Sequence, residues 1–246
     1  MQTTNEVLHH LNARMRFFID DQPNHANGLL YMRQRMNGEV LPFLKMFISE
    51  AVAYRAIRDA NNVELVKLMN VEHTKISSAL ANLGYVRTQI MSSIGARLNL
   101  AEADSDIDIG ALTTGLNNEN GTSIDVCKFT DIAKILTELG FEFHHVFNPD
   151  NFSNQYYSFE KVINGIEFEV KVRDLGATQT ILALHQFLDN ELSDEEITLF
   201  TYAKFLFKKF DKEFPGSQSY VKFKKVLYEW AFSQVEGGFV FDDPTL

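Results

Sequence analysis

The sequence predicts an α+β protein in which a small mixed or antiparallel sheet is flanked by helical regions at both ends of the chain. Apolar residues recur at helical spacing through residues 1–84, and short runs with strand-like alternation follow in residues 85–175. Helical spacing returns in residues 176–246. These three stretches are the predicted N-terminal helical region, α/β core and C-terminal helical region.

Composition restricts the class of protein. Of the 246 residues, 45% are hydrophobic and 23% are charged, as in ordinary globular proteins. The net charge of −10 disfavours nonspecific binding to long nucleic acids, although a local patch could still bind RNA. A single cysteine, Cys127, excludes an intrachain disulfide and suits a reducing compartment. Since no run approaches the roughly 20 apolar residues that span a bilayer, we expect a soluble, cytoplasmic protein with no membrane partner.

The N-terminal region is predicted to contain successive helices. After Gly38 and Pro42, a helical pattern extends from Phe43 to Ile57. A further helix is expected from Val63 to Leu83, and Gly84 is suited to end it.

The α/β core is predicted to hold one helix and several strands. Thr130 or Asp131 could cap the helix, and Gly140 would end it. Asn164 and Gly165 indicate a tight hairpin, because both residue types tolerate positive φ. The predicted strands are residues 88–92, 106–112, 141–147, 156–163 and 166–173.

The C-terminal region is predicted to contain a long capped helix. Ser193 and Glu196 have the spacing of a capping box, and the helix should continue to about Phe214. A last helix is expected from Ser219 to about Val235. A set of lysines makes these helices locally basic, and we interpret them as solvated helix faces rather than as an RNA-binding patch. The set consists of Lys204, Lys208, Lys209, Lys212, Lys222, Lys224 and Lys225.

The most informative segment contains two carboxylates separated by one residue. On a strand, Asp106 and Asp108 point to one face while Ile107 and Ile109 point to the other. Two carboxylates on one face repel each other unless a cation lies between them. Mg²⁺, or Mn²⁺ in its place, suits such a site because a hard ion prefers oxygen ligands.

A later strand could complete this site. Glu167, Glu169, Lys171 and Arg173 share one face of residues 166–173, opposite an apolar face. If this strand neighbours the Asp106 strand, either glutamate could supply a third carboxylate. Lys171 and Arg173 could then lie beside the metal and hold a phosphate.

The order of these motifs resembles the DNA polymerase β-like nucleotidyltransferase superfamily. In that superfamily a strand and a Gly-Ser turn precede an Asp-hydrophobic-Asp-hydrophobic strand. Here Gly95 and Ala96 stand at the turn, and the segment Ser105–Ile109 matches the carboxylate motif. From Gly95 to Asp106 is 106 − 95 = 11 positions, which fits the superfamily. The resemblance covers about residues 85–175, so this stretch is the predicted nucleotidyltransferase-like core.

The resemblance implies an enzyme that transfers a nucleoside monophosphate from an NTP to an acceptor hydroxyl. The acceptor is left open among a small molecule, a protein and RNA. Asp106, Asp108 and Glu169 would be the catalytic and metal-binding residues, with Glu167 as the alternative third carboxylate. A second, weaker resemblance of residues 169–173 to alarmone synthetases favours Glu169. The implied nucleotide-binding residues are Ser93, Gly95, Ala96, Arg97, Lys171 and Arg173.

One residue departs from the superfamily pattern. Ala96 lacks the hydroxyl of the usual serine, although Ser92 or Ser93 could replace it in another register. This departure supports an alternative function, a catalytically reduced protein that serves as a nucleotide-binding or interaction module. A third hypothesis is an RNA-acting terminal transferase that uses the basic C-terminal helices.

Other metal-site interpretations are less well supported. An EF-hand beginning at Asp104 would need glycine and glutamate where Ile109 and Gly115 stand. A glycosyltransferase Asp-x-Asp site usually requires an N-terminal nucleotide-binding domain that the sequence does not show, and a solvated acidic turn is the simplest alternative. His144 and His145 are adjacent on a predicted strand, so they should face opposite ways and form no compact metal pair.

Overall fold

The computed structural model describes residues 36–91, 106–117, 123–147 and 155–221, together with residues 223, 224, 227 and 230. The chain divides into two compact units, residues 60–182 and residues 1–59 with 183–246. A mixed sheet with helices packed on it confirms the predicted α+β class. The region boundaries predicted at residues 84 and 175 stay a prediction.

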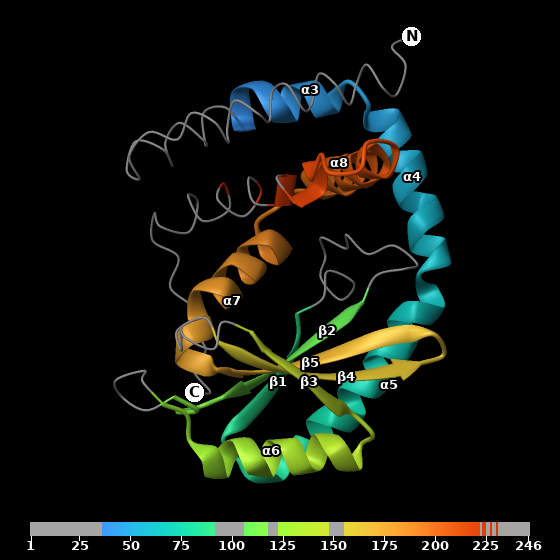
Figure 1. Ribbon diagram of the computed structural model, residues 1–246. Coiled ribbons are helices and arrows are strands. Elements are labelled where there is room, and N and C mark those ends of the chain that lie inside the picture. The colour runs from blue at the N-terminus through green and yellow to red at the C-terminus, as the bar shows by residue number, and fades with distance from the viewer. Residues whose placement is uncertain are drawn as a thin grey trace. The chain divides into compact units, whose positions relative to one another are not determined.

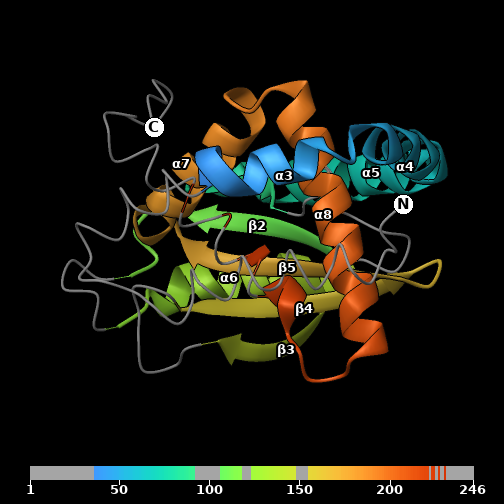
Figure 2. The same cartoon turned by 90° about the horizontal axis from the view of Figure 1, so that it is seen from above.

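A single five-stranded sheet forms the centre of the unit of residues 60–182, with strand order β1-β2-β5-β4-β3. β2 pairs in parallel with β5, and the other three pairings are antiparallel. Figure 2 shows β2, β5, β4 and β3 side by side in this order. The strands are β1 (Val86–Ile90), β2 (Ile107–Thr113), β3 (Glu142–Phe147), β4 (Tyr156–Ile163) and β5 (Ile166–Asp174).

The hairpin between β4 and β5 turns where the sequence predicts it. Asn164 and Gly165 have φ values of 54° and 80°, the left-handed conformations that a two-residue hairpin turn needs. Ile163 and Ile166 pair directly on either side of the turn. This turn sets the register of β4 against β5, and therefore which side chains lie across from Glu169.

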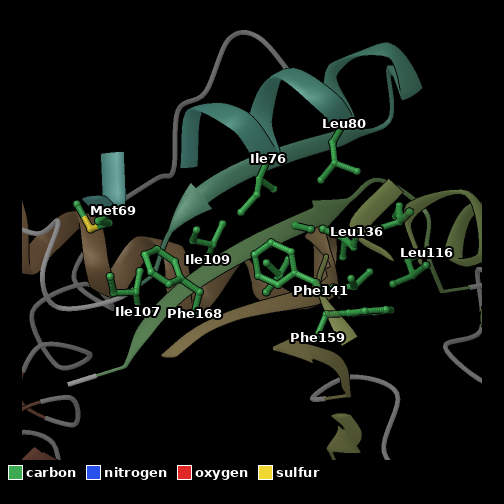
Figure 3. Close-up of a cluster of buried hydrophobic side chains, with 14 of the residues drawn as sticks. Met69, Ile76, Leu80, Ile107, Ile109, Leu116, Leu136, Phe141, Phe159 and Phe168 are labelled. Carbon is green, nitrogen blue, oxygen red and sulfur yellow. The ribbon is translucent and has the colours of Figure 1, made fainter. Parts of the chain in front are cut away.

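Two helices cover one face of the sheet. α5 (Val63–Leu80) and α6 (Val126–Glu138) both lie on this side, as Figure 1 shows. α5 continues into a short 3-10 turn, η2 (Ala81–Leu83), and ends at Gly84 in the left-handed conformation, as expected. The helices and the sheet enclose one apolar core, drawn in Figure 3. Its fully buried members include Ile76, Leu80, Ile107, Ile109, Leu136, Phe168 and Val170.

The predicted start of α6 is wrong. Asp125 is the N-cap, and its side chain accepts a hydrogen bond from the backbone N–H of Lys128 at 3.1 Å. Thr130 lies inside the helix, where its hydroxyl donates to the carbonyl of Val126. Both aspartate and threonine can cap a helix, so closeness to the apolar run did not identify the N-cap. The earlier cap adds a turn that carries Phe129 onto the core.

Alternation along β2 and β5 leaves the other face of the sheet polar. Ile107 and Ile109 of β2 are fully buried on the core side. Asp106 and Asp108 therefore project from the face opposite α5 and α6. The same alternation buries Phe168 and Val170 of β5 and leaves its charged residues on the side of the aspartates.

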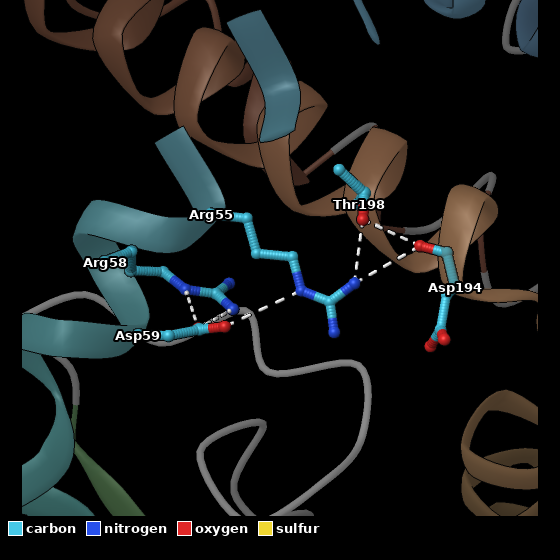
Figure 4. A network of polar contacts seen from close by, with 5 residues as sticks. All are labelled: Arg55, Arg58, Asp59, Asp194 and Thr198. Atoms are coloured by element: carbon cyan, nitrogen blue, oxygen red, sulfur yellow. Dashed lines mark hydrogen bonds and ion pairs between the residues drawn. The ribbon is translucent and has the colours of Figure 1, made fainter. Parts of the chain in front are cut away.

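The described part of the other unit is helical. The predicted capping box of α8 is confirmed, with reciprocal hydrogen bonds between Ser193 and Glu196. α4 and α8 are joined by Arg55, which donates to the hydroxyl of Thr198 at 2.7 Å and to the carbonyl of Asp194 at 3.2 Å (Figure 4). Among the described helices, none is long and apolar enough to cross a membrane. The elements are η1 (Met36–Val40), α3 (Leu41–Lys45), α4 (Ile48–Asn61), α7 (Leu175–Asn190) and α8 (Asp194–Glu213), of which α4 and α7 extend into both units.

The core behind the carboxylates should dominate the stability of the sheet. Phe168 is 0% exposed, whereas Phe143 on the edge strand is 52% exposed. We expect Phe168→Ala to lower the free energy of unfolding by about 3–5 kcal/mol, because it leaves a cavity at the centre of the core. Phe143→Ala is the matched control and should lower it by about 1 kcal/mol or less. Denaturant unfolding followed by circular dichroism measures both, and equal losses would contradict this description of the core.

Candidate functional site

Three carboxylates from two adjacent strands converge on the open face of the sheet. Asp108 of β2 lies directly beside Glu169 of β5 in the parallel register, and Asp106 precedes β2. Asp106, Asp108 and Glu169 each offer an oxygen, and these oxygens all lie within 4.8 Å of one another. A hard divalent cation prefers such a set of oxygen ligands. The group could therefore bind a divalent metal ion.

Lys171 lies between two of these carboxylates. Its ammonium nitrogen is 2.8 Å from Asp108 Oδ1 and 3.1 Å from Glu169 Oε2. On the other side of Glu169, the buried hydroxyl of Ser158 donates to Oε1 at 2.7 Å. Both oxygens of Glu169 are thus oriented by neighbours, which restricts its rotamers before any ligand arrives.

The electrostatics follow from partial burial and mutual charge. Burial raises the pKa of Asp108, opposed by the positive charge of Lys171 and reinforced by Glu169. Burial by itself would lower the pKa of Lys171, but the charges of Asp108 and Glu169 outweigh it and raise that pKa overall. Lys171 is therefore a permanent cation at neutral pH, and it offsets part of the repulsion among the carboxylates.

An aromatic ring connects the two basic residues of this face. The Lys171 ammonium and the Arg173 guanidinium lie 5.4 Å and 5.3 Å from the centre of the Tyr156 ring. Burial lowers the pKa of Arg173, opposed by Tyr156, although an arginine remains charged in proteins. Two cations close to a metal-binding group could hold the oxygens of a phosphate. Sequence reasoning did not find Tyr156, because its position depends on the register of β4.

Glu167 is placed differently from Glu169. It is exposed, and it does not belong to the group of oxygens formed by Asp106, Asp108 and Glu169. The small loss of solvent around its carboxyl group raises its pKa, with further contributions from the charges of Glu160, Asp106 and Glu169. Glu167 thus lies near the candidate site without a converging oxygen. Which glutamate acts as the third carboxylate stays a prediction.

The predicted phosphate-binding turn lies outside the described residues. Ser93, Gly95, Ala96 and Arg97 belong to residues 92–105, for which the structure gives no placement. Their predicted role in nucleotide binding therefore stays a prediction. The described half of the site consists of the carboxylates, Lys171, Arg173 and the residues that orient them.

The expectation that His144 and His145 face opposite ways is wrong. A β-bulge between Phe143 and His145 shifts the register of β3 against β4, so that Phe143 pairs with Phe159 and His145 pairs with Ser158. The Nδ1 atoms of the two imidazoles lie 3.1 Å apart, because the extra residue of a bulge breaks the alternation of side chains. No residue type in this segment distinguishes a bulge from a regular strand.

The register places a row of carboxylates across the open face. Asp108 lies beside Glu169, Glu169 beside Glu160, and Glu160 beside Glu142. Like charges directly opposite each other on a sheet are destabilising. A cation on this face therefore lowers the repulsion, as Lys171 does through its contacts with Asp108 and Glu169.

Comparisons with known proteins assign no family to the chain. No protein-family model and no curated protein matches the sequence. One solved structure with a matching chain is the polymerase core of TRAMP, an RNA surveillance complex. The TM-score is 0.40 and the sequence identity 15%, with 82% of this chain and 67% of that chain covered. At this distance the similarity identifies neither an activity nor a substrate.

Lys171 should compete with a divalent cation for the carboxylates. We expect Lys171→Met to raise the affinity for Mn²⁺ by about tenfold, since a difference of about 1.4 kcal/mol in interaction energy is a factor of ten. Without metal, the same variant should lose about 2 kcal/mol of stability, because breaking a partly buried ion pair leaves a charge uncompensated. Calorimetric Mn²⁺ titration and denaturant unfolding measure the two effects.

The exposed Lys134 on α6 supplies a matched control for this substitution. Lys134→Met should change neither quantity, because it removes the same charge from the opposite face of the sheet. Mn²⁺ affinity that is unchanged or weaker in Lys171→Met would contradict the competition.

Proposed function

We propose that this protein is a metal-dependent nucleotidyltransferase that moves a nucleoside monophosphate from an NTP to an acceptor hydroxyl. The observation that supports the proposal is the convergence of Asp106, Asp108 and Glu169 from adjacent parallel strands. The sequence resemblance to the polymerase β-like superfamily rests on the Gly95 turn, on Ser105–Ile109 and on the later acidic strand. An NTP is the proposed substrate, and Mg²⁺ or Mn²⁺ the proposed cofactor.

In the proposed reaction, the acceptor oxygen forms a bond to the α-phosphorus of the NTP. The bond from that phosphorus to the bridging oxygen of the β-phosphate breaks, and pyrophosphate leaves with the electron pair. When bound, the divalent cation neutralises charge on the triphosphate and lowers the pKa of the attacking hydroxyl. Asp106 and Asp108 provide the oxygens that would hold it.

Glu169 and the basic residues have separate proposed roles. A carboxylate oxygen of Glu169 is suited to orient the acceptor and to receive its proton, because Ser158 and Lys171 hold the group in place. Lys171 could leave Asp108 when metal binds and then contact a phosphate, with Arg173 beside it across the Tyr156 ring. Catalysis would come mostly from positioning and charge neutralisation.

Two observations favour a second candidate function, a catalytically reduced protein that binds a nucleotide or a partner. Ala96 lacks the hydroxyl expected at the phosphate-binding turn, and Lys171 already pairs with two of the three carboxylates.

RNA as acceptor is less favoured. One lysine of the basic set, Lys204, is only 3% exposed and lies 5.2 Å from the centre of the Tyr220 ring.

The exposed free thiol of Cys127 suits a reducing compartment, and we place the activity in the cytoplasm.

Loss of the aspartates should separate the two functions. We expect the wild-type chain to release pyrophosphate from at least one labelled NTP with Mg²⁺ or Mn²⁺, tested with RNA, small alcohols or the protein itself as acceptor. Asp106→Asn/Asp108→Asn should lower the rate by about 100-fold or more, because charge-stabilising groups of an active site contribute at least that much. Metal-dependent NTP binding without release in the wild type would support the second function and contradict the first.

The two glutamates offer a matched pair of substitutions on one strand. Glu169→Gln should lower the rate of pyrophosphate release by about 100-fold, because it removes the proposed base and a metal ligand. Glu167→Gln removes the same charge two residues away, from an exposed side chain, and should lower the rate by less than about tenfold through the local field alone. The reverse order of effects would assign the third carboxylate to Glu167.

A further inference from the structure

A second group of metal-ligating side chains lies on the open face of the sheet, at its β3 edge. His144, His145 and Glu160 each offer one ligand atom, and these atoms all lie within 4.8 Å of one another. The bulge in β3 brings both imidazoles to β4, where Glu160 projects from the same face. None of these residues belongs to the candidate nucleotidyltransferase site.

The spacing of the two imidazole nitrogens matches that of two ligands of one metal ion. Two nitrogens bound to one tetrahedral Zn²⁺ at the usual bond lengths of 2.0–2.1 Å lie about 3.3 Å apart. The Nδ1 atoms of His144 and His145 are 3.1 Å apart. His144 Nδ1 also contacts Glu160 Oε1. The two imidazole nitrogens are therefore spaced like two ligands of one tetrahedral ion, and a carboxylate oxygen is in contact with one of them.

Hydrogen bonds alone satisfy this arrangement poorly. A neutral imidazole nitrogen either carries one hydrogen or offers one lone pair. If His144 Nδ1 donates to Glu160, it has no lone pair to accept a hydrogen from His145. If it accepts from His145 instead, Glu160 must carry a proton to interact with it. A single cation accepts lone pairs from all three atoms at once.

The surroundings favour a divalent cation. Glu160 lies between Glu142 and Glu169 in the row of carboxylates, so the local field is negative. The ring of Tyr156 packs edge-on against His145 at a centroid distance of 6.1 Å and restricts its orientation. The His144 side chain is 55% exposed and that of Glu160 26% exposed, so an ion can enter from solvent.

We propose that His144, His145 and Glu160 form a second metal site that binds a borderline transition ion, Zn²⁺ above all. Two imidazoles and one carboxylate suit Zn²⁺ and leave a fourth position for water or a ligand. The all-oxygen site at Asp106, Asp108 and Glu169 suits harder ions. Bound Zn²⁺ ties the edge strand β3 to β4. This site does not depend on the proposed nucleotidyltransferase activity.

The experiment is a Zn²⁺ titration of the full chain, free of any polyhistidine tag and stripped of metal by a chelator. Calorimetry gives stoichiometry and affinity, and Co²⁺ absorption tests for tetrahedral geometry. We expect one tight equivalent that His144→Ala/His145→Ala abolishes or weakens by more than about 100-fold. Changes in the outer shell of a metal site already weaken binding by about 10- to 100-fold, so loss of ligands should have a larger effect. Zn²⁺ should also raise the Tm of the wild type but not of this variant.

Two further variants make the test specific. His9→Ala/His10→Ala removes another adjacent histidine pair and should keep the tight equivalent. Glu160→Gln keeps the shape of the third ligand and should weaken Zn²⁺ binding by more than about tenfold. Circular dichroism confirms that each variant is folded. Equal Zn²⁺ affinity in the wild type and His144→Ala/His145→Ala would overturn the proposal, as would unchanged affinity in Glu160→Gln.

Discussion

The parallel pairing of β2 with β5 is the constraint on which the candidate site depends. It places Asp108 beside Glu169, although the two residues are far apart in the sequence. The pairing is held from the other face, where Ile107, Ile109 and Phe168 are fully buried. A shift of register by one residue would move all of these side chains to the wrong face. The apolar core therefore fixes the strand register that brings the carboxylates together.

The mutual repulsion of the carboxylates destabilises the folded state, and Lys171 offsets part of it. Lys171 comes from the same strand as Glu169 and contacts both Glu169 and Asp108, so one cation is part of the fold itself. A bound external cation would offset the repulsion that remains. A site that is partly neutralised by its own lysine can fold without metal and still bind one, since binding then exchanges one cation for another.

The β-bulge gives the edge of the sheet a different chemistry from its centre. Regular alternation would leave one histidine of β3 on the core side of the sheet, where Phe159 is buried. The bulge instead turns His144 and His145 to the open face, beside Glu160. Bulges often occur at sheet edges and re-aim side chains there. The same face thus presents oxygen ligands at β2 and β5 and nitrogen ligands at β3.

The sequence by itself determined the α+β class, the hairpin at Asn164 and Gly165, and the open-face position of Asp106 and Asp108, because each depends on local periodicity or on turn chemistry. It left open which strand neighbours β2, and its predictions of where α6 begins and how the histidines of β3 point were wrong. Only the tertiary structure decided these features. Strand order and register are set by packing between distant segments, and a bulge depends on the partner strand. The residues of one strand therefore do not determine these features by themselves.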